Sequence, residues 1–239
     1  MRAAVAAMIL STVFLFSLTH AVSGNPDNAP VVLILVDDGL TWTSAEDPGL
    51  SPIFDNGAVA SLSTSQGRAP EDPRMGYIIL GAGARADTSV LPEDLPRERE
   101  KISGSFTGPA ATIHPGALGD ALDQDDVRTA AVGGRASLVV MNSQGEVPIS
   151  YGLGEPVKHL KDAFRRGAEL VAIEVSDPRG ARKVAAAART ARAVVAIASP
   201  NAPGGSANLT PFALAAPGDS DGVLYSPGTR TTGLMSNED

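Results

Sequence analysis

Carboxylates follow two apolar runs that have the composition of buried strands. Val31–Val36 is a continuous apolar run, and two aspartates, Asp37 and Asp38, come directly after it. Asp177 follows a second run of this kind, Leu170–Val175. A carboxylate at the carboxyl end of a strand can bind a hard divalent cation, although an Asp-Gly pair also closes an ordinary turn. The sequence therefore permits a cation site without requiring one.

Imidazole ligands are scarce in this chain. It has three histidines, of which two lie beyond the N-terminal segment. His114 precedes a Pro-Gly pair in an expected loop, and His159 falls in a predicted amphipathic helix, where a surface position is favoured. Two-metal phosphoryl transfer needs several imidazoles and carboxylates, and zero cysteines exclude thiolate ligands. An intact di-zinc site is therefore excluded, whereas one hard cation held by Asp38, Asp72 and Asp177 is permitted.

Gly81–Ala86 fits the loose dinucleotide pattern G-x-G-x-x-A. That pattern binds a pyrophosphate when a helix begins within it and its first amides face the ligand. The stretch that follows, Asp87–Lys101, is charged and contains two prolines, so we interpret it as an exposed loop. The glycines are therefore interpreted as a structural turn, and no nucleotide cofactor is predicted.

Short apolar runs alternate with amphipathic stretches along most of the chain. This alternation predicts an α/β fold with a mostly parallel sheet and helices on both faces. Catalytic groups of such sheets lie beyond the carboxyl ends of the strands, which draws attention to residues 37–38, 176–177 and 199–201. Strands are expected at Val31–Val36, Ala58–Leu62, Arg128–Val132, Ser137–Met141, Leu170–Val175 and Ala193–Ala198, and helices at His159–Arg166 and Arg179–Arg192, while Met75–Leu80 fits either element.

The first 24 residues have the layout of a secretory signal. Arg2 supplies a positive charge, residues 3–18 carry none, and small and polar residues lead to Gly24. The apolar run is slightly shorter than the roughly 20 residues of a membrane-spanning helix. We predict that residues 1–24 are a cleaved signal peptide or an uncleaved N-terminal anchor. The remainder is then extracytoplasmic, either secreted or associated with a membrane through this segment.

Length and charge limit the remaining possibilities. The chain has 239 residues, a net charge of −8 and 4% aromatic residues. Residues 30–239 are enough for one large domain, whose core must consist mainly of Val, Ile, Leu and Ala. A strongly acidic chain repels the phosphate backbone, so no nucleic-acid partner is predicted.

The order of these motifs resembles the alkaline phosphatase superfamily. Its members have an Asp-Gly pair after the first strand, as at Asp38, and a helix like the stretch at Met75–Gly83. The resemblance looks closest to phosphatase-like ectodomains of bacterial membrane proteins. It implies an alkaline-phosphatase-like α/β domain over residues 30–239. The abrupt stop at Asp239 leaves open that this domain is truncated at its C-terminus. The further segments that carry it are Leu118–Leu122, Arg128–Gly133 and Leu209–Pro217.

The resemblance implies metal-binding roles for some residues, whereas other functional residues of the family are missing from this chain. Asp38 matches the metal ligand of the first strand, and Asp177 matches the next aspartate ligand. The histidine expected after that aspartate is missing, because residues 178–180 are Pro-Arg-Gly. The Asp-His-Gly expected after the Ala193–Ala198 run is Ser-Pro-Asn here. The nucleophile position falls at Asp72 or the preceding glutamate, and a carboxylate is not the family's alkoxide nucleophile.

We therefore expect an extracytoplasmic, alkaline-phosphatase-like domain that has lost catalytic competence and serves in binding or scaffolding. No cofactor beyond a single divalent cation is expected, and the sequence names no ligand. Two alternatives stay open. One is a metal-dependent phosphoester hydrolase or transferase with a reduced carboxylate site, which requires Asp38, Asp72 and Asp177 to converge. The second is a secreted small-ligand-binding α/β domain unrelated to phosphatases.

Overall fold

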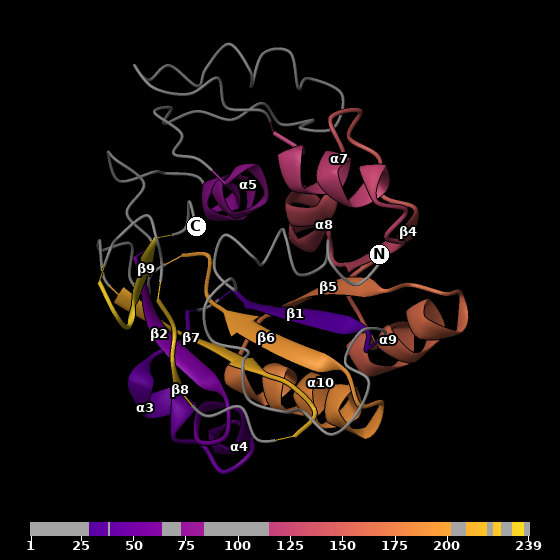
Figure 1. The fold of residues 1–239 in the computed structure, drawn as a ribbon. Helices are drawn as coiled ribbons and strands as arrows, with labels where there is room; N and C mark the ends of the chain where they lie inside the picture. Colours follow the sequence, from indigo (N-terminus) through magenta and orange to yellow (C-terminus); the bar gives the residue numbers. More distant parts are fainter. Residues whose placement is uncertain are drawn as a thin grey trace, which may run out of the picture.

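The computed structural model describes residues 29–37, 39–63, 73–83, 115–201, 209–218, 222–225 and 231–236. Asp38, Asp72, His114 and the N-terminal segment lie outside the described residues. The described residues form a nine-stranded, mostly parallel sheet with helices on both faces (Figure 1). The predicted α/β class is confirmed. None of the helices in this described part is long and apolar enough to cross a bilayer.

The elements carry the labels of Figure 1. The strands are β1 (Val31–Val36), β2 (Ala58–Ser63), β3 (Thr129–Val132), β4 (Ile149–Tyr151), β5 (Leu170–Val175), β6 (Val194–Ala198), β7 (Leu209–Ala215), β8 (Gly222–Val223) and β9 (Leu234–Ser236). The helices are α3 (Trp42–Ala45), α4 (Ser51–Phe54), α5 (Arg74–Ala82), α7 (Ala117–Gln124), α8 (Gly134–Val140), α9 (Pro156–Arg165) and α10 (Pro178–Thr190).

Strand β1 occupies the centre of the sheet. The strand order is β4-β3-β5-β1-β6-β7-β2-β8, and β9 also pairs with β2. Val31 lies opposite Leu170 of β5 and opposite Val194 of β6, and both pairings are parallel. Strand β7 is antiparallel to both of its neighbours. Helices cover both faces of β1, and a continuous apolar run is the pattern that such a strand requires.

Two helical layers bury the two faces of the sheet. In Figure 1, α5, α7 and α8 lie above the sheet, and α3, α4, α9 and α10 lie below it. Val32 and Ile34 belong to the apolar core that contains α9 and α10 residues, whereas Leu35 belongs to the core on the α5 and α8 side. Alternation of successive side chains between the faces of a strand explains this division.

Helices α5 and α8 touch through their backbones at a glycine. A Cβ atom added to Gly81 would lie 2.5 Å from the carbonyl oxygen of Val139. Gly83 then ends α5 in the left-handed region, with φ of 62°, where glycine is least strained. Two glycines of the G-x-G-x-x-A pattern therefore serve helix packing and helix termination. Gly81 lies inside α5 and not in the turn that the sequence predicted.

The strand expected at Ser137–Met141 is wrong, because most of this run forms helix α8. Ala136, Leu138, Val139 and Val140 are all buried, and Ser137 is the one polar side chain among the last five residues of the helix. A short apolar run without a polar face does not distinguish a buried helix from a buried strand. The ambiguous stretch Met75–Leu80 also proves to be helical, as part of α5.

Core packing around β1 generates a stability prediction. Ile34 is fully buried at the centre of the strand, so Ile34→Ala leaves a cavity. We expect this change to lower the free energy of unfolding by about 2–5 kcal/mol, measured by urea titration. Val223→Ala, at a side chain that is 55% exposed, is the control and should change it by less than about 0.5 kcal/mol. Equal losses in the two variants would contradict the burial of β1.

Candidate functional site

The carboxyl ends of β1 and β5 carry acidic side chains on the face that α5 and α8 cover. Leu35 of β1 and Ala172 of β5 belong to the apolar core on that face. Asp37 follows Leu35 by two residues, and Glu174 follows Ala172 by two. Side chains two apart on a strand share a face, so both carboxylates lie at the end of this core.

Four side chains from four elements meet there, and we call them the carboxylate–arginine cluster: Asp37, Tyr77, Arg135 and Glu174. Nη1 of Arg135 forms an ion pair with Oδ2 of Asp37. Nε of Arg135 lies 4.0 Å from Oε1 of Glu174. The Tyr77 hydroxyl donates to Oδ1 of Asp37 at 3.3 Å. The cluster joins the end of β1 to α5, α8 and β5.

Glu174 also caps helix α8 from the neighbouring strand. Its Oε2 accepts a hydrogen bond from the backbone N–H of Arg135 at 3.0 Å. The first N–H groups of a helix lack partners within the helix and carry partial positive charge. Gly133 leaves room for this contact, because a Cβ atom there would lie 2.5 Å from the same oxygen, and its φ is +98°. Glu174 therefore stabilises the start of α8.

The protonation states in the cluster follow from burial and charge. Burial, and then the negative charges of Asp37 and Glu174, raise the pKa of Tyr77 above its usual value. Burial opposes the charged form of Arg135, but the hydrogen bond and charge of Asp37 outweigh it and raise the pKa of the guanidinium. Tyr77 is therefore a neutral donor and Arg135 a cation at neutral pH. The Tyr77 hydroxyl does not supply a nucleophilic phenolate under these conditions.

The end of β6 also has a structural role. The hydroxyl oxygen of Ser199 lies 3.0 Å from the carbonyl oxygen of Val36 and 2.7 Å from that of Asn201. The Asn201 side-chain amide donates to the carbonyl oxygen of Pro73 at 2.8 Å. These contacts join the ends of β1 and β6 to the start of α5. The side chains of Ser199 and Asn201 therefore bind backbone carbonyl groups.

Asp177 is the predicted metal ligand that the structure describes. It is the N-cap of α10, and its Oδ1 accepts from the backbone N–H of Gly180 at 2.8 Å. No group of three or more His, Asp and Glu side chains among the described residues is arranged to hold a metal ion. Asp38 and Asp72 are outside that part of the chain, so the convergence of the three aspartates stays a prediction.

His159 lies on α9, as expected, and is partly buried. Its ring stacks on Tyr151 with a centroid distance of 4.7 Å. The Tyr151 hydroxyl donates to Oδ2 of Asp162 at 2.6 Å. Burial and then the hydrogen bond to Asp162 raise the pKa of Tyr151. This contact group stabilises the connection between β4 and α9.

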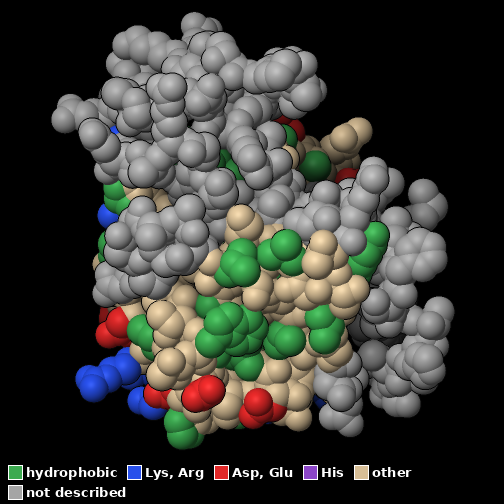
Figure 2. Space-filling view, turned by 90° about the vertical axis from the view of Figure 1, so that its left-hand side faces the viewer, with side chains coloured by type: hydrophobic (Ala, Val, Ile, Leu, Met, Phe, Trp, Pro, Cys, Tyr) green, Lys and Arg blue, Asp and Glu red, His purple; other side chains and the backbone are tan. Residues whose placement is uncertain are grey.

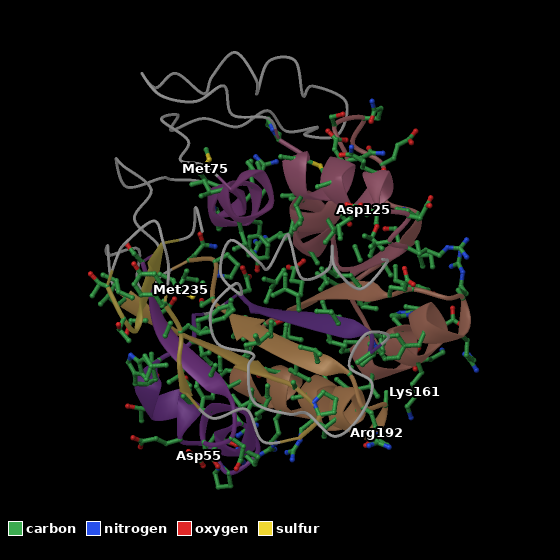
Figure 3. All side chains as sticks on the ribbon, viewed as in Figure 1. Asp55, Met75, Asp125, Lys161, Arg192 and Met235 are labelled. Carbon is green, nitrogen blue, oxygen red and sulfur yellow. The ribbon has the colours of Figure 1, made fainter. Side chains whose placement is uncertain are left out.

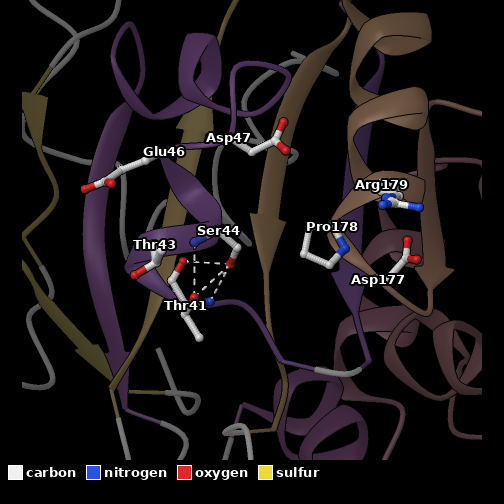
Figure 4. A pocket seen from close by; sticks show the side chains of 8 residues that line it. All are labelled: Thr41, Thr43, Ser44, Glu46, Asp47, Asp177, Pro178 and Arg179. Atoms are coloured by element: carbon white, nitrogen blue, oxygen red, sulfur yellow. Dashed lines mark hydrogen bonds between the residues drawn. The ribbon is translucent and has the colours of Figure 1, made fainter.

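An open pocket of about 680 Å³ lies between α3 and the start of α10 (Figure 4). Thr41 and Ser44 form a reciprocal cap at α3, with Ser44 Oγ accepting from the Thr41 N–H at 2.8 Å. Asp47 Oδ1 accepts from the Gly49 N–H at 2.8 Å, which fixes that carboxylate. The lining is therefore polar and partly preorganised, and it consists of Thr41, Thr43, Ser44, Glu46, Asp47, Asp177, Pro178 and Arg179.

Sequence reasoning located this edge of the sheet but missed three of the four cluster residues. A glutamate inside the apolar run Leu170–Val175 was a usable signal, because a charge in a buried strand requires a partner. Tyr77 and Arg135 gave no such signal, since each is unremarkable in its own helix. Their partners become visible only when α5 and α8 are placed over the sheet.

The sequence matches no protein-family model and no curated protein. Among solved structures, the chain is similar to the PH0037 protein from Pyrococcus horikoshii, with a TM-score of 0.46 and 13% identity. The similarity covers 89% of this chain and 94% of that one. The interpretation of the site therefore depends on the contacts described above.

The role of Asp177 as a helix cap can be tested directly. We expect Asp177→Ala to lower the free energy of unfolding by about 0.5–2 kcal/mol, whereas Asp177→Asn, which retains the accepting oxygen, should lose far less. Urea unfolding with and without millimolar MgCl₂ or MnCl₂ is the measurement. A cation-dependent stabilisation of the wild type that Asp177→Asn abolishes would instead establish a ligand role.

The raised pKa of Tyr77 predicts a loss of stability in alkali. A tyrosine in the unfolded chain ionises near pH 10, while Tyr77 keeps its proton in the folded chain. Its contribution is therefore complete below about pH 10 and declines as the pH rises further, because the unfolded state then binds fewer protons. Urea unfolding on both sides of pH 10 should show this decline, and Tyr77→Phe should flatten it. Tyr225→Phe, at a side chain that is 46% exposed, is the control and should leave it unchanged.

Proposed function

We propose that this chain is an extracytoplasmic, alkaline-phosphatase-like domain that binds or scaffolds without catalysing phosphoester chemistry. The N-terminal segment supports export, and the motif order supports the superfamily. The observation that carries the proposal is the ion pair of Arg135 with Asp37 at the carboxyl end of β1. A guanidinium beside that carboxylate opposes the approach of a divalent cation by charge repulsion.

Two further described carboxylates, one in β5 and one at the start of α10, also have partners within the protein. Glu174 caps α8 through the Arg135 N–H, and Asp177 caps α10 through the Gly180 N–H. Tyr77 donates to Asp37 at the end of β1. Metal-assisted phosphoryl transfer needs ligands that are free to clamp the attacking and leaving oxygens. The carboxylates at this edge of the sheet therefore favour a structural role over a catalytic one.

The pocket between α3 and α10 is a candidate site for ligand binding. The pocket between α3 and α10 has a volume within the range of small-ligand sites. Its walls offer hydroxyl, carboxylate and guanidinium groups, some of which are already fixed by hydrogen bonds. This pocket also favours the alternative of a secreted small-ligand-binding domain, which shares the non-catalytic character of the proposal.

Phosphoester hydrolysis tests the proposal. We expect the purified protein to show no cleavage of p-nitrophenyl phosphate above the metal-only blank with Zn²⁺, Mn²⁺ or Mg²⁺. Release of p-nitrophenol is followed by absorbance for the wild type, Asp38→Asn and the control Asp55→Asn, which changes an exposed carboxylate at the end of α4. Turnover that Asp38→Asn abolishes and Asp55→Asn retains would overturn the non-catalytic assignment.

A further inference from the structure

Basic residues are concentrated in the segment that contains α9 and α10. Residues 156–192 hold nine of the chain's 19 Lys and Arg residues but four of its 27 Asp and Glu residues. This segment is therefore cationic, although the whole chain has a net charge of −8. The sequence showed no basic run, because the cations are spaced along two helices that the fold places side by side.

The positive charges of the two helices point away from the core. All nine Lys and Arg residues of this segment are exposed, while the buried positions of both helices are apolar. Three of the nine form ion pairs, namely Lys158, Arg165 and Arg182. Six have no carboxylate partner among the described residues: Lys161, Arg166, Arg179, Lys183, Arg189 and Arg192.

Figure 3 places two of these cations at one end of the domain, while Arg179 lines the pocket beside α3. Figure 3 labels Lys161 and Arg192 at the lower right, beside α9 and α10. Figure 2 shows the opposite end of the sheet, where apolar side chains gather and Lys and Arg appear only towards the left margin. The two labelled cations therefore lie away from the apolar side that Figure 2 shows.

Strand β1 begins between the C-terminal ends of α9 and α10. The Val31 N–H donates to the carbonyl oxygen of Glu169 at 2.7 Å, and the Val194 N–H donates to that of Pro30 at 2.8 Å. Glu169 comes shortly after α9, and Val194 comes shortly after α10. The chain thus reaches the sheet between two helix ends, each of which carries two cations: Arg165 and Arg166 on one side, Arg189 and Arg192 on the other.

The apolar N-terminal run is close in sequence to this point. It ends at Leu18, eleven residues before Ala29. An extended chain spans at most about 3.3–3.6 Å per residue, so these residues reach about 40 Å at most. A membrane that holds the apolar run is therefore within reach of the side of the domain on which β1 begins.

We infer that the basic surface, formed by Lys161, Arg165, Arg166, Lys183, Arg189 and Arg192, binds the anionic headgroups of a lipid bilayer and turns this side of the domain towards the membrane. The inference rests on the proposed extracytoplasmic location with residues 1–24 kept as an uncleaved anchor, and adds an orientation to it. Anionic bilayers attract Lys and Arg near their surface. One apolar attachment combined with a polybasic patch is a recognised route to stable membrane binding.

Neither the helix dipole nor a nucleic-acid partner accounts for the cations as well as a bilayer does. Basic residues in the last turn of a helix interact favourably with its dipole, which accounts for Arg165 and Arg189. The dipole does not account for Lys161 and Lys183, which lie further from the helix ends. A nucleic acid is also polyanionic, but it lacks the apolar phase that the N-terminal run requires, whereas a bilayer supplies both chemistries.

Vesicle binding tests the inference with the full chain as purified. Binding is compared on phosphatidylcholine vesicles and on phosphatidylcholine–phosphatidylglycerol vesicles, because the apolar run contributes equally to both. The triple variant Lys161→Gln, Lys183→Gln and Arg189→Gln removes three positive charges. The control Gln124→Glu, Gln144→Glu and Ser150→Glu lowers the net charge equally at exposed positions outside α9 and α10.

We expect the wild type to bind the anionic vesicles more tightly than the neutral ones. The triple variant should lower this ratio of affinities by up to about 100-fold, because each cation contributes about fivefold. The control variant should retain most of it. Raising NaCl from about 0.1 M to about 1 M shortens the screening length from about 10 Å to about 3 Å and should abolish the preference.

Equal binding of the wild type to both vesicles, or equal losses in the triple and control variants, would overturn the inference. Binding of a random-sequence DNA duplex that displaces the protein from anionic vesicles would also overturn it. These outcomes are independent of the p-nitrophenyl phosphate assay. Turnover there would refute the non-catalytic function and leave the vesicle result standing.

Discussion

The burial of β1 between β5 and β6 is the constraint on which the rest of the structure depends. In this register, Val36 lies opposite Val175, and Leu35 lies opposite Ala198. The residues that follow the three strands are therefore brought to one edge, where Asp37 meets side chains from α5 and α8. The same register places the first residues of β1 at the opposite edge, between the ends of α9 and α10. One set of pairings thus positions both the carboxylate–arginine cluster and the basic surface.

Much of this framework could be predicted from the sequence. Continuous apolar runs identified β1 and β6, and a run interrupted only by Glu174 identified β5, because a strand covered on both faces needs few polar positions. The alanine-rich stretch that became α10 was also recognised. Helix α8 was mistaken for a strand, since its apolar residues show no period that separates the two structures. Strand β7 was not predicted, and its Pro211 is a residue that rarely occurs inside a sheet.

The site was less predictable than the fold for a physical reason. Local sequence shows where a carboxylate stands, as it did for Asp37 and Asp177, but it does not show what neutralises that carboxylate. Arg135 reaches Asp37 only because α8 crosses the sheet beside α5, and Gly81 sets how closely those helices approach. The role of a charge therefore depends on packing between distant segments. The charges of α9 and α10 illustrate the same point, since Lys and Arg residues that are spread along the sequence come close together only when the two helices pack.

The position of β1 also has a consequence for the order of folding. Its partners β5 and β6 lie about 140 and about 160 residues later in the chain. Contacts of such separation form slowly, because the entropy of closing the intervening loop must be overcome first. The central strand therefore stays unpaired until almost the whole domain is available. Under the export proposed above, this delay would leave a polypeptide that has not yet folded and that a narrow translocation channel can pass.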